Sequence, residues 1–170
     1  MALALSLVFD EAAVVPVRAL WQALADAGIS RDMLELNYPP HLTLVVADDD
    51  GMEDAMRQAL SQGRDRSISI TLGGVNRFDG TQVVWLECYG GDALTALHAD
   101  IATQLPLEGI RPYYRPGQWT PHMTLQTAGD AEAALGLSTS HWRGPVEIQA
   151  VRLELARFLP VQVLDNVALG

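Results

Sequence analysis

The order of apolar and polar residues shifts along the chain between the two-residue period of strands and the wider spacing of helices. Leucines at alternate positions predict a strand over residues 3–9. Apolar side chains at helical spacing then predict a helix over 16–27, with Pro16 near its start and Gly28 after its end. The chain therefore opens with a strand followed by a helix.

The same two patterns continue to the C-terminus. Further strands are predicted at 41–46, 67–75, 81–88, 122–127, 145–156 and 160–167. Further helices are predicted at 52–62, 92–105 and 130–136. The segment Asn76–Gly80 between two of the strands has the composition of a hairpin turn. Because the strands lack the long apolar runs of a doubly wound parallel sheet, these hairpins favour an antiparallel α+β fold.

Composition narrows the class of protein. The 170 residues are 49% hydrophobic, which suits one ordinary domain or two small lobes that share one interior. No apolar run approaches the ~18 residues of a membrane span, and the opening MALALSLVFDE lacks the basic start of a signal peptide. The single cysteine, Cys88, excludes an intrachain disulfide and suits a reducing compartment. We therefore expect a cytoplasmic protein that does not enter a membrane.

Charge narrows the class of ligand. Eleven basic and 21 acidic residues give a net charge of −10, and no basic cluster occurs along the chain. A protein that grips long nucleic acid neutralises many phosphates with basic side chains, so an extended RNA or DNA footprint is not expected. A small phosphate-bearing ligand, held by a few local groups, remains compatible with this charge.

Two short stretches of the chain have nearly the same sequence. YPPHLTL at 38–44 and WTPHMTL at 119–125 share an aromatic residue, then Pro-His, then Thr and Leu two and three positions after the histidine. The histidines are 81 residues apart, which is close to half the chain length. An internal repeat is the best explanation of this spacing.

The spacing inside each motif has a geometric meaning. Side chains alternate along a strand, so His41 and Thr43 project from one face, roughly 7 Å apart, and His122 and Thr124 do the same. We expect both segments to be central strands that face one cleft. One neutral imidazole can then take a proton from water while the other, protonated, gives one to a leaving oxygen. The threonine hydroxyls can hold phosphate oxygens, so this chemistry needs no metal.

With these paired motifs the chain resembles the 2H phosphoesterase superfamily, and most closely its 2′-5′ RNA ligase-like branch, which contains RNA 2′,3′-cyclic phosphodiesterases. The resemblance covers nearly the whole chain in length and element order. It implies one bilobal α+β domain over residues 1–170, with two pseudo-symmetric lobes, antiparallel sheets lining a central cleft, and helices outside. It also implies that both His-Thr pairs are catalytic, with His41 as general acid and His122 as general base, and without a cofactor.

The expected function is hydrolysis of a 2′,3′-cyclic phosphate by a monomeric, metal-independent enzyme. Classical RNA-processing members often carry a basic residue after each motif, whereas Val45-Val46 and Gln126-Thr127 stand here. Together with the acidic net charge, this argues against recognition of RNA ends, and a cyclic nucleotide, a short oligonucleotide or an ADP-ribose-derived cyclic phosphate fits better as substrate. The alternatives are a non-catalytic module that binds nucleotides or RNA ends, and a reversible 2′-5′ RNA ligase.

Four further residues are candidates for substrate binding. Tyr38 and Trp119 precede the histidines and can stack on a base, although aromatic residues at the start of strands often belong to the core. Trp85 lies on a strand face that is either cleft or core. Arg115, in the loop before the second motif, is the best-placed cation for a phosphate, although loop arginines are mostly solvated.

A metal site is the rival use of two histidines. No Asp or Glu accompanies them at the spacing of metal ligands, and the motif lacks the H-E-x-x-H arrangement of zinc enzymes. The remaining histidines, His98 and His141, are predicted to be packing or surface residues. We therefore expect no metal site.

Overall fold

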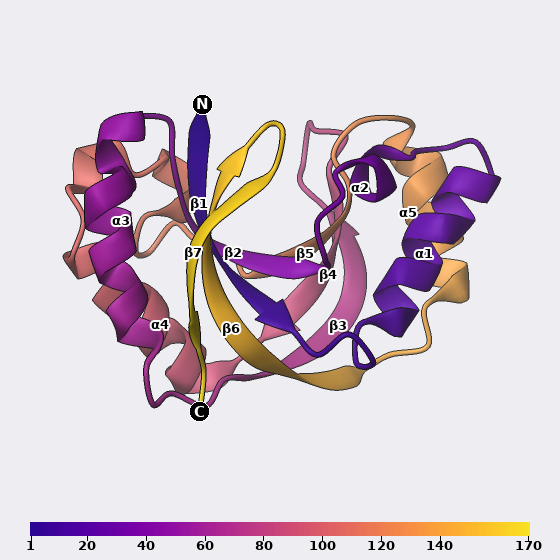
Figure 1. The fold of residues 1–170 in the computed structure, drawn as a ribbon. Coiled ribbons are helices and arrows are strands. Elements are labelled where there is room, and N and C mark those ends of the chain that lie inside the picture. Colours follow the sequence, from indigo (N-terminus) through magenta and orange to yellow (C-terminus); the bar gives the residue numbers. More distant parts are fainter.

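The computed structural model describes all residues, 1–170, and consists of a strongly curved antiparallel sheet with helices on two sides (Figure 1). The strands are β1 (Ala2–Phe9), β2 (His41–Ala47), β3 (Ser69–Arg77), β4 (Val84–Tyr89), β5 (His122–Gln126), β6 (Val146–Phe158) and β7 (Gln162–Ala168). The α-helices are α1 (Val15–Asp26), α2 (Asp32–Glu35), α3 (Glu53–Ala59), α4 (Gly91–Thr103) and α5 (Ala131–His141). The predicted antiparallel α+β fold is confirmed.

The sheet is built from two halves that meet on β6. The hydrogen-bonded strand order is β2-β1-β6-β3-β4-β5, with β7 pairing β6, and every pairing is antiparallel. The series β1, α1, β2, α3 in the first half recurs as β4, α4, β5, α5 in the second. The C-terminal part of β6 pairs with β1, and its N-terminal part, from residue 146 to 149, pairs with β3. The repeat seen in the motifs therefore extends to whole elements.

The two histidine strands, β2 and β5, lie at the ends of this strand order. We expected central strands, and that expectation was wrong, because β2 pairs only with β1 and β5 only with β4. The curvature of the sheet nevertheless brings β2 and β5 into contact in the middle of the molecule, without a ladder of hydrogen bonds between them (Figure 1). Each strand therefore has one edge without a neighbouring strand, and only Ala47, at the end of β2, bridges to a residue outside the sheet, Ile110.

The helices cross between the halves. α3 and α4 lie on one side of the sheet, and α1, α2 and α5 lie on the other (Figure 1). α1, which follows β1, contacts β5, whereas α4, which follows β4, contacts β2. Each half thus covers the histidine strand of the other half with its own first helix.

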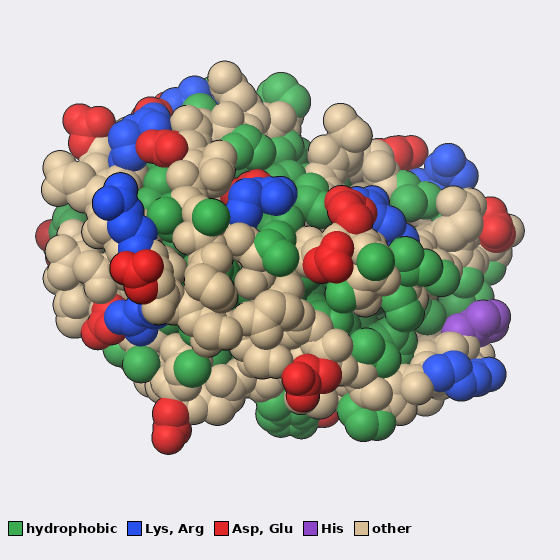
Figure 2. All heavy atoms as spheres, turned by 60° about the horizontal axis from the view of Figure 1, so that its bottom comes forward, with side chains coloured by type: hydrophobic (Ala, Val, Ile, Leu, Met, Phe, Trp, Pro, Cys, Tyr) green, Lys and Arg blue, Asp and Glu red, His purple; other side chains and the backbone are tan.

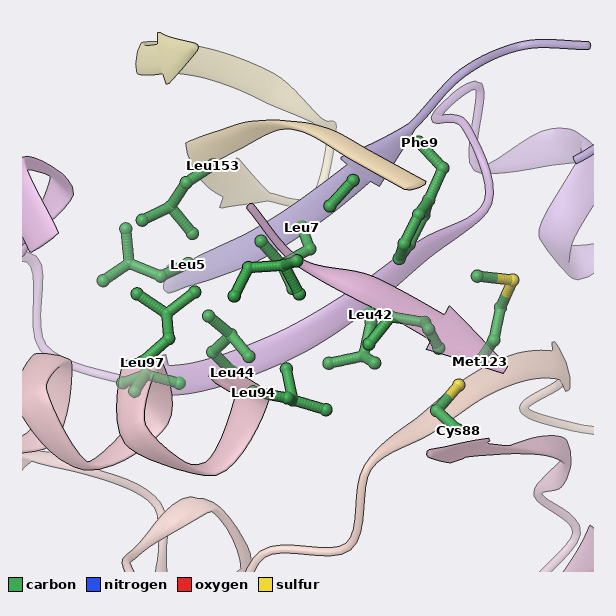
Figure 3. Packing of buried hydrophobic residues seen from close by; sticks show 14 of the residues in the cluster. Leu5, Leu7, Phe9, Leu42, Leu44, Cys88, Leu94, Leu97, Met123 and Leu153 are labelled. Carbon is green, nitrogen blue, oxygen red and sulfur yellow. The ribbon is translucent and has the colours of Figure 1, made fainter. Parts of the chain in front are cut away.

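Buried leucines fix which face of β2 points to the cleft. Leu42 and Leu44 are fully buried and point toward Leu94 and Leu97 of α4 (Figure 3). A shift of the β2 register by one residue would turn these leucines to solvent at a cost of about 1.5–3 kcal/mol each. The histidine and threonine of the motif, which have the opposite parity, are therefore held on the other face.

Most predicted elements occur within a few residues of their expected bounds. α1 begins with Pro16 in its first turn and ends before Gly28, whose φ of 69° closes the helix. The short helix α2 was not predicted, and α5 extends to His141 rather than residue 136. None of the helices is long and apolar enough to cross a lipid bilayer.

Candidate functional site

The two imidazoles are anchored in the same way. His41 and His122 are the first residues of β2 and β5. Nδ1 of His41 donates a hydrogen bond to the Pro39 carbonyl at 2.8 Å, and Nδ1 of His122 donates one to the Thr120 carbonyl at 2.7 Å. Because a neutral imidazole carries one proton, this bond places it on Nδ1 and leaves Nε2 as a free acceptor. Each motif therefore presents one unpaired Nε2.

His41 lies beside a buried carboxylate network. The edge of Tyr38 meets the imidazole with ring centres 4.8 Å apart, and Phe158 lies at 6.4 Å on another side. The Tyr38 hydroxyl donates to Oε2 of Glu154 at 2.8 Å, and Nε of Arg152 donates to Oε1 at 2.9 Å. Tyr38 is 5% exposed, so little of its ring is left for stacking on a base.

His122 lies in a more apolar setting. Phe78, from the β3–β4 hairpin, meets the imidazole at 5.1 Å with perpendicular rings, and Trp85 of β4 meets it at 5.9 Å. Phe78 and Trp85 stack on each other at 4.8 Å. The Trp85 side chain is buried, and its indole N–H has no hydrogen-bond partner. The two histidines thus have similar anchors and different neighbours.

Burial lowers the pKa of both imidazoles. Burial is the main cause that lowers the pKa of His41 to about 4, and a charge on His122 also lowers it. The Pro39 carbonyl and the Glu154 carboxylate raise the pKa of His41, but by less. Burial also lowers the pKa of His122, against the effect of the Thr120 carbonyl. Near neutral pH both rings are therefore neutral in the empty site. A negative charge placed beside them favours protonation of one ring.

The threonines of the two motifs line a cavity of about 650 Å³, together with His41. This volume lies within the range of small-molecule pockets. The Thr43 hydroxyl lies 3.3 Å from Oγ of Ser6, its direct neighbour on β1. The cavity extends toward α2, with Met33 and Leu36, and toward the end of β6, with Phe158 and Leu159, and its walls also include Arg111 and Tyr114 of the loop before β5. His122 does not line the cavity, so the motifs contribute one imidazole and two hydroxyls to its surface.

Comparison with known proteins identifies the family. The sequence model of the 2′-5′ RNA ligase superfamily matches residues 10–159, which is most of the chain. The chain belongs to this superfamily. No curated protein matches the chain in sequence.

Solved structures share the fold of this superfamily member at low sequence identity. TT0787 of Thermus thermophilus is 17% identical with a TM-score of 0.68, over 99% of this chain and 98% of that one. Escherichia coli LigT complexed with 3′-AMP is 19% identical with a TM-score of 0.63, over 99% and 97%. Kluyveromyces marxianus Usb1 is 12% identical with a TM-score of 0.56, over 99% and 98%. These likenesses confirm the 2H phosphoesterase fold.

None of the four substrate-binding candidates of this superfamily member lines the cavity; they are Tyr38, Trp85, Arg115 and Trp119. The Arg115 guanidinium donates to the backbone carbonyls of Ile110, at 2.9 Å, and of Glu108, at 3.4 Å. Trp119 stacks on His98 with ring centres 4.0 Å apart. The loop that carries Arg115 thus uses its guanidinium to hold its own backbone.

Sequence reasoning missed several side chains around the site. Phe78 and Phe158 flank the two imidazoles, and Glu154 lies within the charged surroundings of His41. Ser6 offered a signal, because it is the only polar residue in the first strand; the structure buries it completely. Phe78 offered none, since its position depends on how the hairpin folds over β5.

No group of three or more His, Cys, Asp or Glu side chains is placed to hold a metal ion. The one cysteine, Cys88, is buried, and burial raises the pKa of its thiol. It packs between apolar side chains of the two halves (Figure 3).

Proposed function

We propose that the protein is a metal-independent phosphodiesterase that opens the 2′,3′-cyclic phosphate of a nucleotide or short RNA end. The observation that carries this proposal is the matched pair of imidazoles, His41 and His122. Each is anchored through Nδ1 to a carbonyl two residues earlier, and each keeps Nε2 free. A site that only binds phosphate does not need two titratable groups prepared in the same way.

In this mechanism one imidazole accepts a proton and the other donates a proton during the reaction at one phosphorus. His122 takes a proton from water, and the water oxygen forms a new bond to phosphorus. The bond from phosphorus to one ribose oxygen breaks, and His41, as the imidazolium, gives that oxygen its proton. The product is a phosphomonoester with a free neighbouring hydroxyl. The net change is the addition of one water molecule.

His41 takes up the proton that it needs from solvent when the anionic substrate binds. The pKa of His41 is about 4 in the empty site, so the ring is neutral near pH 7. A cyclic phosphodiester carries one negative charge, and an anion next to an imidazole favours its protonated form. The hydroxyls of Thr43 and Thr124, which line the cavity, can donate to the two non-bridging oxygens and hold the phosphorus in place.

The charges of the molecule favour a small substrate. All eleven basic side chains are arginines, and eight of them pair with a carboxylate. Arg111, the one arginine that lines the cavity, donates to both carboxylate oxygens of Asp48. Basic and acidic side chains are interspersed on the face shown in Figure 2, without a continuous basic area. An extended RNA backbone would find few unpaired cations here.

The ligands of one structural relative support a nucleotide-sized substrate. Structures of E. coli LigT have been solved with 3′-AMP, with ATP and with NADP⁺. The cavity of about 650 Å³ beside His41 has apolar walls near Phe158 and Leu159. We place the nucleoside there, with its phosphate between the two motifs.

The test is a screen of the purified protein against 2′,3′-cyclic nucleotides and short RNAs with cyclic ends. Phosphorus NMR identifies whether the product carries a 2′- or 3′-phosphate. His41→Ala and His122→Ala should each reduce turnover by at least ~100-fold, as expected for loss of a general acid or base, and both should remain folded. Wild-type turnover in either folded variant would remove the two-histidine mechanism. Binding without turnover by the wild type would leave a recognition module instead.

A further inference from the structure

Two tryptophans hold the backbone of the two motifs from opposite halves of the chain. The indole N–H of Trp119 donates to the Thr43 carbonyl at 3.0 Å. The indole N–H of Trp21 donates to the Thr124 carbonyl at 3.1 Å. The same atom of each motif, the carbonyl oxygen of its threonine, thus receives a hydrogen bond from the half that does not contain it.

The position of the histidine strands explains why these carbonyls are available. β2 and β5 are the outer strands of the hydrogen-bonded order, and they contact each other without pairing. An edge strand leaves backbone groups without a ladder partner, and such groups need another partner when they are buried. The two indoles supply it: Trp119, three residues before β5, bonds to β2, and Trp21 of α1 bonds to β5.

Both indoles are themselves held firmly. Trp21 is 2% exposed on α1, the helix that crosses to β5. Trp119 stacks nearly parallel on His98 of α4, with ring centres 4.0 Å apart and planes 9° from parallel. Nε2 of His98 donates to the Tyr114 carbonyl at 2.9 Å, which fixes the ring on which Trp119 rests. A displacement of either threonine backbone would therefore have to move a packed helix.

We propose that Trp21 and Trp119 form a crossed brace that sets the distance between the two histidine motifs. They are positioning residues, because each contacts a motif backbone rather than the reacting atoms. Proton transfer at two places around one phosphorus requires both imidazoles within reach at once, and a misplacement of about 1 Å can cost about 100-fold in rate. This inference rests on the proposed phosphodiesterase activity.

A third tryptophan whose indole N–H donates to a backbone carbonyl provides a matched control. The indole N–H of Trp142, which follows α5, donates to the Gly73 carbonyl at 2.7 Å. This bond is of the same type, but it holds β3 rather than β2 or β5. Trp142→Phe therefore removes an indole–carbonyl bond without touching either motif.

The experiment measures kcat and KM of Trp21→Phe, Trp119→Phe and Trp142→Phe, with thermal unfolding of each. The two brace variants should lose roughly 10- to 100-fold in kcat, with KM changed less than about threefold, because the substrate-binding groups remain. Trp142→Phe should keep kcat within about twofold of wild type. Unchanged kcat in both folded brace variants, or an equal loss in Trp142→Phe, would overturn the brace.

A second measurement does not depend on activity. NMR titration of His41 reports its burial and its interaction with His122, and loosening of the brace should raise its pKa toward the ordinary value in both brace variants. An unchanged pKa would contradict the brace even if no substrate is found. If a phenylalanine variant does not fold, site-specific benzothienylalanine keeps the bicyclic ring and replaces N–H with sulfur, and the same outcomes apply.

Discussion

The lowered pKa of His41 predicts a specific loss of stability in mild acid. The ring titrates at about 4 in the folded protein, against about 6.5 in the unfolded chain. The unfolded state therefore binds protons more readily than the folded state. The contribution of His41 to the free energy of unfolding is complete above pH 6.5 and is lost as the pH falls toward 4. Because the two pKa values of His41 differ, this one side chain lowers the free energy of unfolding by about 2 kcal/mol between pH 7.5 and pH 5.

The perturbation that isolates this contribution is His41→Gln, which keeps a polar side chain and removes the titration. Urea unfolding followed by tryptophan fluorescence gives the free energy of unfolding at pH 7.5 and pH 5. The loss between these pH values should be about 2 kcal/mol smaller in the variant than in wild type. His141→Gln, which changes an exposed histidine, should lose as much as wild type. Equal losses in wild type and His41→Gln would refute the lowered pKa of this imidazole.

Three further outcomes follow from the surroundings of the site. Because the Glu154 carboxylate raises the pKa of His41, Glu154→Gln should move the alkaline limb of the kcat–pH profile to lower pH, whereas surface Glu132→Gln should not. A moved acidic limb would instead make His41 the base. Ser6→Ala removes a hydroxyl 3.3 Å from that of Thr43, and the loss of one hydrogen bond should reduce kcat/KM by about two- to twelvefold. Wild-type kcat/KM would show that the Thr43 hydroxyl does not need Ser6 for its orientation. Activity should survive EDTA, and its loss and recovery with a divalent ion would favour metal catalysis.

The parts of the site that sequence predicted well are those that depend on the period of a strand. Leu42 and Met123 alternate with the histidines and threonines, so the strand period alone separates the core face from the cleft face. The repeat of the motif also predicted two related halves, and the antiparallel α+β fold followed from the hairpins. These inferences need only short stretches of sequence and the comparison of two of them, 81 residues apart.

The parts that sequence did not predict depend on contacts between distant segments. The positions of β2 and β5 at the ends of the strand order depend on which strands pair across β6. The indole N–H of Trp21 finds its acceptor 103 residues away, after α1 has crossed to the other half. Arg115 was chosen for its place before the second motif, but carbonyls of its own loop satisfy its guanidinium first. Local pattern does not contain this information.

A perfect repeat would be a poor catalyst of this reaction. Two identical sites would give two imidazoles of equal basicity, whereas acid–base catalysis needs one to hold a proton while the other lacks it. The anchors at His41 and His122 are alike, so the difference must come from their neighbours. The Glu154 carboxylate raises the pKa of His41, although burial outweighs it, whereas no charged side chain shifts the pKa of His122. In the proposed mechanism the motif supplies the reactive groups, and side chains outside it assign their roles.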